Sequence, residues 1–189
     1  MYGHIHIILK DLVLSIADVD VWKKILEDAG ITTDESEAQV LDTIQQNDEV
    51  TLSLVGSTCK VLGLAVNDAL YAFGKHFVQF ALRSGHELFL KSVGSTLPAF
   101  LANINGLHTC LERDHPNARF PFFEGNYDPV EDHVHLMYLS TRSGLKALVV
   151  GVIEEVGLRI FGLDVTLKEV DVPEDQKEAF GEAAAAWTV

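Results

Sequence analysis

Before Pro116, apolar positions recur three or four residues apart, which is the period of a helix with one buried face. Aspartates and glycines between these runs are typical helix starts and stops. Pro98 suits the first turn of a helix, where no backbone donor is lost. The pattern predicts helices over residues 3–17, 20–30 (capped by Asp20), 48–63, 67–85 and about 95–115, with the polar, acidic stretch 32–47 as a loop.

After Pro116 the pattern changes. Residues 119–124 should be extended around Pro121, and residues 133–140 alternate as a half-buried strand does. Residues 145–160 predict another long helix, 163–170 another strand, and 186–189 a last edge strand, while the rest of the tail after Pro173 is ambiguous. Helices first and strands later indicate an α+β fold: a mainly helical N-terminal lobe, then a lobe with a small antiparallel sheet and helices.

The composition excludes several classes of protein. The chain has 189 residues, enough for one domain with a sizeable core, and 28 acidic residues against 14 Lys and Arg give a formal net charge of −14. We therefore expect no nucleic-acid binding and no attachment to a membrane through a basic helix. The sequence shows no run of roughly 20 apolar residues and no signal peptide at its start, so the expected location is cytoplasmic. Cys59 and Cys110 are expected to be small core residues.

His108 lies on the apolar side of its predicted helix, with Leu101, Ile104 and Leu111 at helical spacing. A buried imidazole needs a partner for at least one ring nitrogen. One interpretation is a core histidine bonded to a backbone carbonyl. The other is a single axial ligand to a heme iron, which needs one neutral imidazole in an apolar wall.

Tyr138, Ser140 and Arg142 are alternate residues, so in a continuous strand they point the same way and span roughly 13 Å. Two hydroxyls and a guanidinium in a row form an anion clamp, and Arg suits bidentate binding of a carboxylate. The alternative is a solvated strand face, although the flanking residues are hydrophobic. Together with His108, the clamp matches a ligand that has an iron centre and two carboxylates, namely heme b.

Two other features bear on metal chemistry. The sequence contains no Cys-x-x-Cys-His, which excludes covalent c-type heme attachment. His133 and His135 are two apart on a strand and share a face, as a pair of metal ligands would. With no nearby Cys or third His to complete a site, we expect this pair to be simply exposed.

These residues belong to a longer pattern, and the chain resembles the H-NOX (heme nitric oxide/oxygen binding) family, including the heme domain of the soluble guanylate cyclase β subunit and its stand-alone bacterial relatives. The matches reach to about residue 170. They are Met1-Tyr2-Gly3, Val21-Trp22, Ala72-Phe73-Gly74-Lys75, Gly94-Ser95, Pro98-x-Phe100-Leu101, Leu107-His108 with Leu111, Arg119-x-Pro121-x-Phe123, Tyr138-x-Ser140-x-Arg142, Gly144-Leu145 and Gly151.

The resemblance implies a single domain, 1–189, with a distal helical lobe over about 1–65, a proximal lobe with the sheet over about 66–189, and a non-covalent heme b between them. His108 is then the proximal iron ligand, and Tyr138, Ser140 and Arg142 hold the propionates with help from Arg119. Pro121 would press on the heme face and distort the porphyrin. The remaining expected heme contacts are Ile5, Leu9, Phe77, Ile104, Leu107, Leu148 and Val152. Asn105 departs from the family, where Asp is common, but an amide still hydrogen-bonds.

The choice of gas follows from the same resemblance. Oxygen-binding members place a tyrosine on the helix after the Arg, three before its glycine, and that position is Leu148 here. Since no tyrosine follows Tyr138 and bound O₂ needs a donor, the expected ligands are NO and CO.

The expected function is a heme-based sensor, not an enzyme. NO binding would release the proximal histidine, and a partner protein such as a histidine kinase or a diguanylate cyclase would respond to the relaxed helix. A heme enzyme such as a peroxidase or NO dioxygenase is the alternative. Peroxide chemistry needs a distal acid–base group, for which His76 is the one residue to check. A carrier of an apolar ligand without heme is a third hypothesis.

Overall fold

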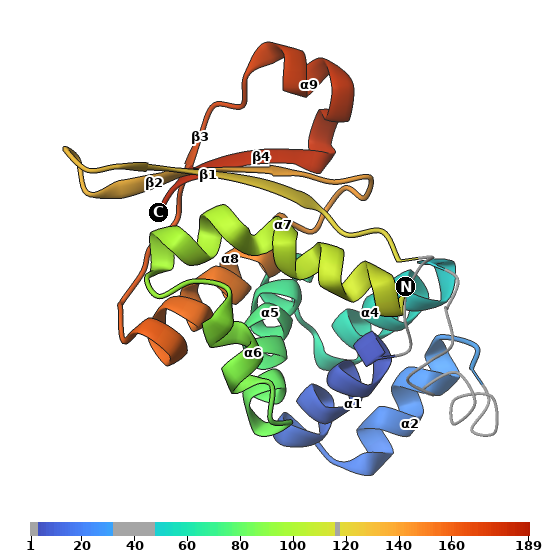
Figure 1. Cartoon of the computed structure of the whole chain (residues 1–189). Helices are drawn as coiled ribbons and strands as arrows, with labels where there is room; N and C mark the ends of the chain where they lie inside the picture. Colours follow the sequence, from blue (N-terminus) through green and yellow to red (C-terminus); the bar gives the residue numbers. More distant parts are fainter. Residues whose placement is uncertain (1–3, 32–47, 116–117) are drawn as a thin grey trace.

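The computed structural model describes residues 4–31, 48–115 and 118–189, so the predicted loop at 32–47 and the opening Met1-Tyr2-Gly3 lie outside the described residues (Figure 1). The elements are α1 (His4–Ile16), α2 (Val19–Asp28), α4 (Asp48–Leu62), α5 (Val66–Arg83), α6 (Glu87–Ser92), α7 (Leu97–Asp114), β1 (Phe122–Asp128), β2 (His133–Leu139), α8 (Lys146–Val156), the π-helical turn η1 (Gly157–Phe161), β3 (Lys168–Val170), α9 (Glu174–Phe180), the 3-10 turn η2 (Gly181–Ala183) and β4 (Ala184–Thr188). The predicted α+β class is confirmed.

The predicted glycine stops lie where helices end. Gly30, Gly63 and Gly85 follow α2, α4 and α5 with φ of 72°, 67° and 86°. This left-handed conformation costs glycine least, which is why it suits the residue after a helix. The predicted start of α7 is also confirmed, because Thr96 caps it.

Several boundaries differ from the sequence prediction. Asp18, not Asp20, caps α2, since its carboxylate accepts a hydrogen bond from the N–H of Val21 at 2.9 Å. The short helices α6 and α9 are additional. The last strand begins at Ala184 and is not an edge strand. The strand expected at 163–170 is only three residues long. Within that stretch, only Lys168–Val170 pair with β4 in the sheet.

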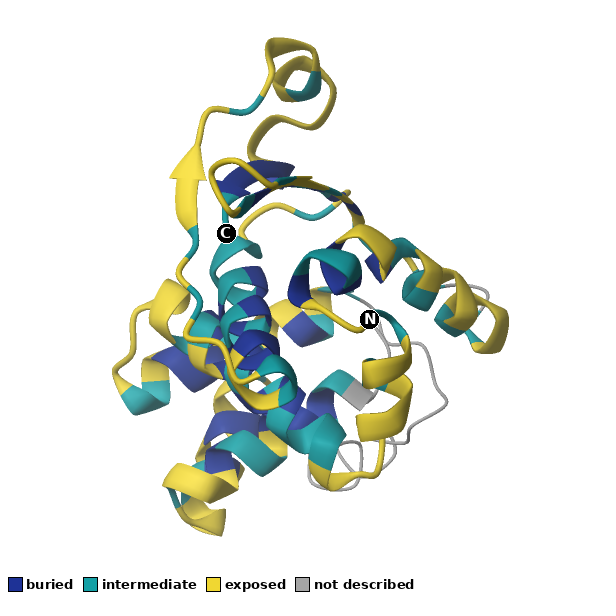
Figure 2. Cartoon of the chain, turned by 60° about the vertical axis from the view of Figure 1, so that its left-hand side comes forward, coloured by how far each residue is buried: buried dark blue, intermediate teal, exposed yellow. Residues whose placement is uncertain are grey.

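The sheet is antiparallel throughout, in the order β1-β2-β4-β3. β4 therefore pairs on both sides, and its alanines and Trp187 are buried. In Figure 1 helix α7 runs along one face of the sheet, while α9 stands beyond the sheet on the other side. Figure 2 shows buried residues concentrated in the central helices and the sheet, with α9 and β3 largely exposed.

The core consists of two clusters. The sheet cluster joins the sheet to α7, α8 and one residue of α5, and is made of Val78, Leu97, Phe100, Leu101, Ile104, Phe123, Val134, Leu136, Tyr138, Val149, Ile153, Val156, Ala185 and Trp187. The N-terminal cluster joins α1, α2, α4 and α5 through Ile8, Leu9, Val13, Trp22, Ile25, Leu26, Leu54 and Phe73. Phe77 of α5 packs against both clusters.

Two glycines set the close approach of α5 and α8. A Cβ at Gly74 would lie 2.2 Å from the carbonyl oxygen of Leu148, and one at Gly151 would lie 2.3 Å from that of Tyr71. Both distances are shorter than any real contact, so only glycine allows the two backbones to meet here. This contact fixes Phe77 and Leu148 relative to each other.

The two cysteines differ from each other. Cys59 is buried as expected, but the expectation for Cys110 is wrong, because it is exposed. Two residues correspond to about 200° of helical turn, so Cys110 lies on the side of α7 opposite to His108.

Among the described residues, no single helix is long and apolar enough to cross a bilayer. Helices α4 and α5 reach that length and apolar character only as a pair, which is bent by 108°.

Candidate functional site

The ring of His108 is fixed by the chain that leads into β1. Its Nδ1 is 3.0 Å from the carbonyl oxygen of Pro121. A carbonyl only accepts, so Nδ1 carries the proton and donates it, which leaves Nε2 as the basic nitrogen. Among the described residues Nε2 has no hydrogen-bond partner. Burial lowers the pKa of His108, against the raising effects of Pro121 and Glu112, and thereby favours the neutral ring.

Aromatic rings and one amide hold this part of α7 against β1. The His108 ring stacks on Phe120 at 5.0 Å between centroids and lies 5.9 Å from that of Phe123. The Asn105 side chain donates to the Phe123 carbonyl at 2.6 Å and accepts from the Phe123 N–H at 2.9 Å. The expectation that an amide at this position still hydrogen-bonds is confirmed.

The three residues of the expected clamp lie close together, by a different geometry from the one the sequence suggests. Tyr138 and Ser140 are buried, which excludes a solvated strand face. The strand ends at Leu139, and Ser140 accepts a hydrogen bond from the backbone N–H of Arg142 at 3.0 Å. A serine turn, and not a continuous strand, therefore brings Arg142 back toward Ser140.

Arg142 is held by groups that sequence reasoning missed. Its Nε donates to Asp48 at 2.7 Å and its Nη2 to the same carboxylate at 3.3 Å, while Nη1 donates to the Arg119 carbonyl at 2.9 Å. The pKa of Asp48 is lowered to about 2, and hydrogen bonds from Arg142 are the largest of the causes. Asp48 begins α4, 94 positions away along the chain, and nothing in the local sequence signals the contact.

The apolar residues expected around a heme are divided between the two clusters. Ile5, Phe77 and Leu148 pack against the N-terminal cluster, to which Leu9 belongs, while Ile104 is part of the sheet cluster and Val152 packs against it. Leu107 is partly buried beside His108. Helix α8 thus presents Leu148 to one cluster and Val152, one turn later, to the other.

His76 is engaged elsewhere. It is buried, and its Nε2 lies 2.6 Å from the carboxylate of Asp11, which Arg83 also contacts at 2.6 Å. This pair fastens α5 to α1. The Nε2 atom of His76 is therefore occupied by Asp11 and does not project as a free acid–base group.

These residues fit a non-covalent heme by their chemistry. Iron takes a neutral imidazole whose second nitrogen donates to a carbonyl, which is what His108 and Pro121 provide. Propionates take hydroxyl and guanidinium donors. Arg142 has five N–H groups, of which the three bonds above use three, so two remain for a carboxylate.

The α+β fold, the carbonyl-bound histidine and the arginine beside buried hydroxyls fit a heme-binding domain. A sequence model described as Haem-NO-binding matches residues 2–169, and the chain belongs to this family. The family consists of heme-binding gas-sensor domains that are not catalytic, so the function class, a sensor and not an enzyme, is confirmed at that level.

Similar proteins agree with this assignment. Soluble guanylate cyclase gcy-35 of Caenorhabditis elegans is 29% identical over 184 residues, which are 95% of this chain and 26% of that protein. Soluble guanylate cyclase gcy-32 of the same organism is 30% identical over 171 residues, which are 88% and 24%. The chain thus spans about a quarter of the length of these relatives.

Solved structures share the fold. A mutant of the H-NOX protein from S. oneidensis, in the Fe(II) ligation state, has a TM-score of 0.78 at 17% identity, with 100% of this chain and 94% of that chain covered. The Fe(II) unliganded H-NOX protein from K. algicida has a TM-score of 0.78 at 17% identity, with coverage of 100% and 95%.

Proposed function

We propose that this domain senses NO, and also CO, through one non-covalent heme b whose iron is bound by His108. When bound, the ferrous heme supplies the site for the gas. Tyr138, Ser140 and Arg142 hold the propionates, with Arg119 beside them, and Pro121 presses on the heme face.

The hydrogen bond from His108 to Pro121 is the observation that carries the proposal. It fixes the protonated nitrogen, orients the ring, and turns the basic Nε2 away from the carbonyl. An ordinary core histidine satisfied by a carbonyl would look the same at Nδ1. The difference is Nε2, which has no partner within the described residues.

The remaining residues determine which gas stays bound. Leu148, Phe77, Ile5 and Leu9 offer no hydrogen-bond donor, and no tyrosine follows Tyr138. A polarised Fe–O₂ unit needs such a donor, whereas NO binds iron tightly with little help. These apolar side chains therefore favour NO and CO over O₂.

The signal leaves through α7. His108 would hold the heme iron and would be released from it on NO binding, and the two hydrogen bonds between Asn105 and Phe123 would couple a resulting movement of α7 to β1. We place the heme between a distal lobe, residues 1–65, and a proximal lobe, residues 66–189. The partner is a histidine kinase or a diguanylate cyclase, or a cyclase region like those of the guanylate cyclase relatives.

The test is the visible spectrum of the reduced protein under argon, air, CO and NO. We expect a five-coordinate ferrous spectrum that is unchanged in air, a six-coordinate complex with CO, and a five-coordinate complex with NO after histidine release. A colourless protein that takes up no added hemin would refute heme binding. A stable oxy complex in air would refute the gas selectivity, and rapid peroxide turnover would favour the enzyme alternative.

A further inference from the structure

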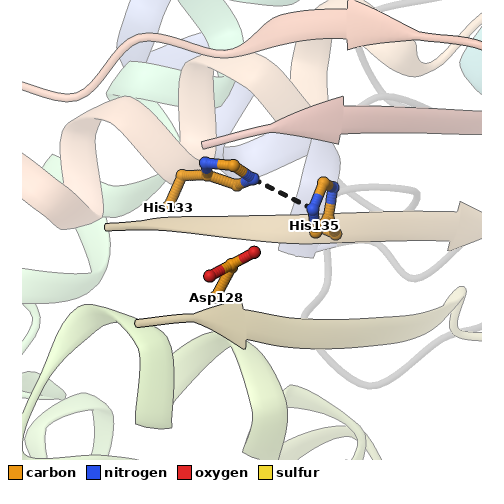
Figure 3. A group of neighbouring side chains, drawn as sticks. All are labelled: Asp128, His133 and His135. Atoms are coloured by element: carbon orange, nitrogen blue, oxygen red, sulfur yellow. Dashed lines mark hydrogen bonds between the residues drawn. The ribbon is translucent and has the colours of Figure 1, made fainter. Parts of the chain in front are cut away.

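The outer face of the β1–β2 hairpin carries a cluster of three potential metal ligands, none of which belongs to the proposed heme site. Figure 3 shows Asp128 at the end of β1 facing His133 and His135 on β2. One ligand atom from each side chain lies within 4.8 Å of the other two. It is the one group of this kind within the described residues.

The strand geometry brings these residues together. His133 and His135 are alternate residues of β2 and so share a face, opposite to the buried Val134 and Leu136. Asp128 is the register partner of His133 across the hairpin. The sequence pattern reveals the two histidines, but the third ligand emerges only once the register is known.

The two imidazoles already converge on a common point. Their Nε2 atoms are 2.9 Å apart, with the ring planes at 85°. Two N–H groups cannot face each other at that distance, so at least one Nε2 is an unprotonated acceptor. A tetrahedral zinc ion with Zn–N bonds of about 2.0–2.1 Å holds two nitrogens about 3.3 Å apart. Metal binding would require the two nitrogens to open by a few tenths of an ångström and the rings to turn so that both lone pairs point at the ion.

Asp128 is held in place by the turn that follows it. Its Oδ1 accepts hydrogen bonds from the N–H groups of Val130 at 2.8 Å and Glu131 at 3.3 Å. These bonds fix the carboxylate at the end of β1, beside the histidines.

We propose that Asp128, His133 and His135 bind a divalent transition-metal ion, with zinc as the reference ion. Two imidazoles and a carboxylate are the ligand set of open zinc sites, in which water takes the fourth position. Mg²⁺ and Ca²⁺ prefer sites made of oxygen ligands and are excluded by the two nitrogens. The ion joins the end of β1 to the start of β2.

The experiment is a titration of the full chain, as purified, with ZnCl₂ in competition with a chromophoric chelator. We expect one zinc ion per chain at micromolar concentration, and no competition from millimolar Mg²⁺. His133→Gln and His135→Gln should each weaken binding at least tenfold. Asp128→Asn should weaken it less, because the amide oxygen still accepts the turn bonds. X-ray absorption at the zinc edge should show two imidazole ligands.

The matched control is His86→Gln, which removes another exposed histidine, outside the cluster, and should leave zinc affinity unchanged. Circular dichroism of each variant checks that it is folded. Equal zinc binding by the parent and the His133→Gln/His135→Gln double variant would overturn the proposal, and so would the absence of micromolar binding in the parent. Neither result bears on heme binding, because the site shares no residue with His108 or Arg142.

Discussion

At the scale of single residues, one backbone oxygen determines which nitrogen of His108 is basic. The Pro121 carbonyl can only accept, so it selects the tautomer in which Nε2 has the lone pair. The proline side chain has no part in this bond. The residue expected to press on the heme face thus has a second role, through its backbone.

Replacing His108 with Gly should remove the protein ligand and leave a hole that free imidazole fills. Without imidazole the reduced variant should lose the five-coordinate histidine spectrum, and millimolar imidazole should restore it. The measurement is the visible spectrum of the reduced variant. An unchanged spectrum in the absence of imidazole would contradict the assignment of the ligand.

The sequence allows the reactive side chains to be predicted better than their partners. His108, Tyr138 and Arg142 stand out because each is a polar side chain among apolar residues, where burial would require a hydrogen-bonding partner. The carbonyls of Arg119 and Pro121 cannot be identified as partners from the sequence, since every residue has a backbone carbonyl. Asp48 looks like an ordinary helix start, and only tertiary folding brings it to Arg142.

At the scale of elements, Asn105 joins α7 to β1 through a donor and an acceptor at once. Aspartate at this position accepts from the Phe123 N–H but sets a second oxygen against the Phe123 carbonyl. Asn105→Asp should therefore cost about 1–3 kcal/mol of unfolding free energy, measured by urea denaturation. Asn103→Asp is the matched control, because exposed Asn103 makes only one such bond, to Val93, and should lose less. Equal losses would contradict the two-bond account.

The contact between α5 and α8 is predicted to be intolerant of a methyl group. Gly151→Ala places a Cβ against the Tyr71 carbonyl and should destabilise the fold by about 1–3 kcal/mol through overpacking. Gly106→Ala is the control, since Gly106 lies on the exposed side of α7 and nothing lies within 4 Å of the added carbon. It should stabilise by up to about 1 kcal/mol through helix propensity. Thermal unfolding of both variants, compared with the parent, measures the two effects.

The ion pair between Asp48 and Arg142 predicts an acid-sensitive link from α4 to the turn after β2. The folded pKa of Asp48 is lowered from 3.8 to about 2, so its contribution to stability is present above pH 4 and is lost as the pH falls toward 2. The pair is partly exposed, which limits that contribution to about 1 kcal/mol or less. Asp48→Asn should be less stable than the parent at pH 6, with the difference vanishing near pH 2. A difference that persists there in urea titrations would mean that the charge is not the cause.

At the scale of the whole molecule, local patterns predict the helices well and the sheet only in part. Helix ends depend on residues nearby, such as Gly30 and Thr96, and the sequence shows them. Strand order depends on partners far away along the chain. β4 is an alanine run with weak strand propensity, and its place inside the sheet follows from pairing with β2 and β3 on both sides.

The two core clusters meet along α5 and α8, and this boundary is where the choice of gas is expected to be made. Leu148 packs on the N-terminal side of the boundary and Val152 on the sheet side. Leu148→Tyr places a phenol near the bound gas. One new hydrogen bond of about 1–1.5 kcal/mol raises O₂ affinity about tenfold, a partial gain unless a second group orients the hydroxyl. NO affinity should hardly change.

The matched control puts the same phenol on the same helix, away from the boundary. Ala147 lines a separate cavity of about 450 Å³ with Val150 and Trp187, which has room for a tyrosine ring. Ala147→Tyr should leave O₂ binding as weak as in the parent. Stopped-flow measurement of O₂ dissociation from the reduced variants separates the two cases. If Leu148→Tyr gains nothing, or if Ala147→Tyr gains as much, then position 148 does not face the gas and the selectivity must arise elsewhere along the boundary.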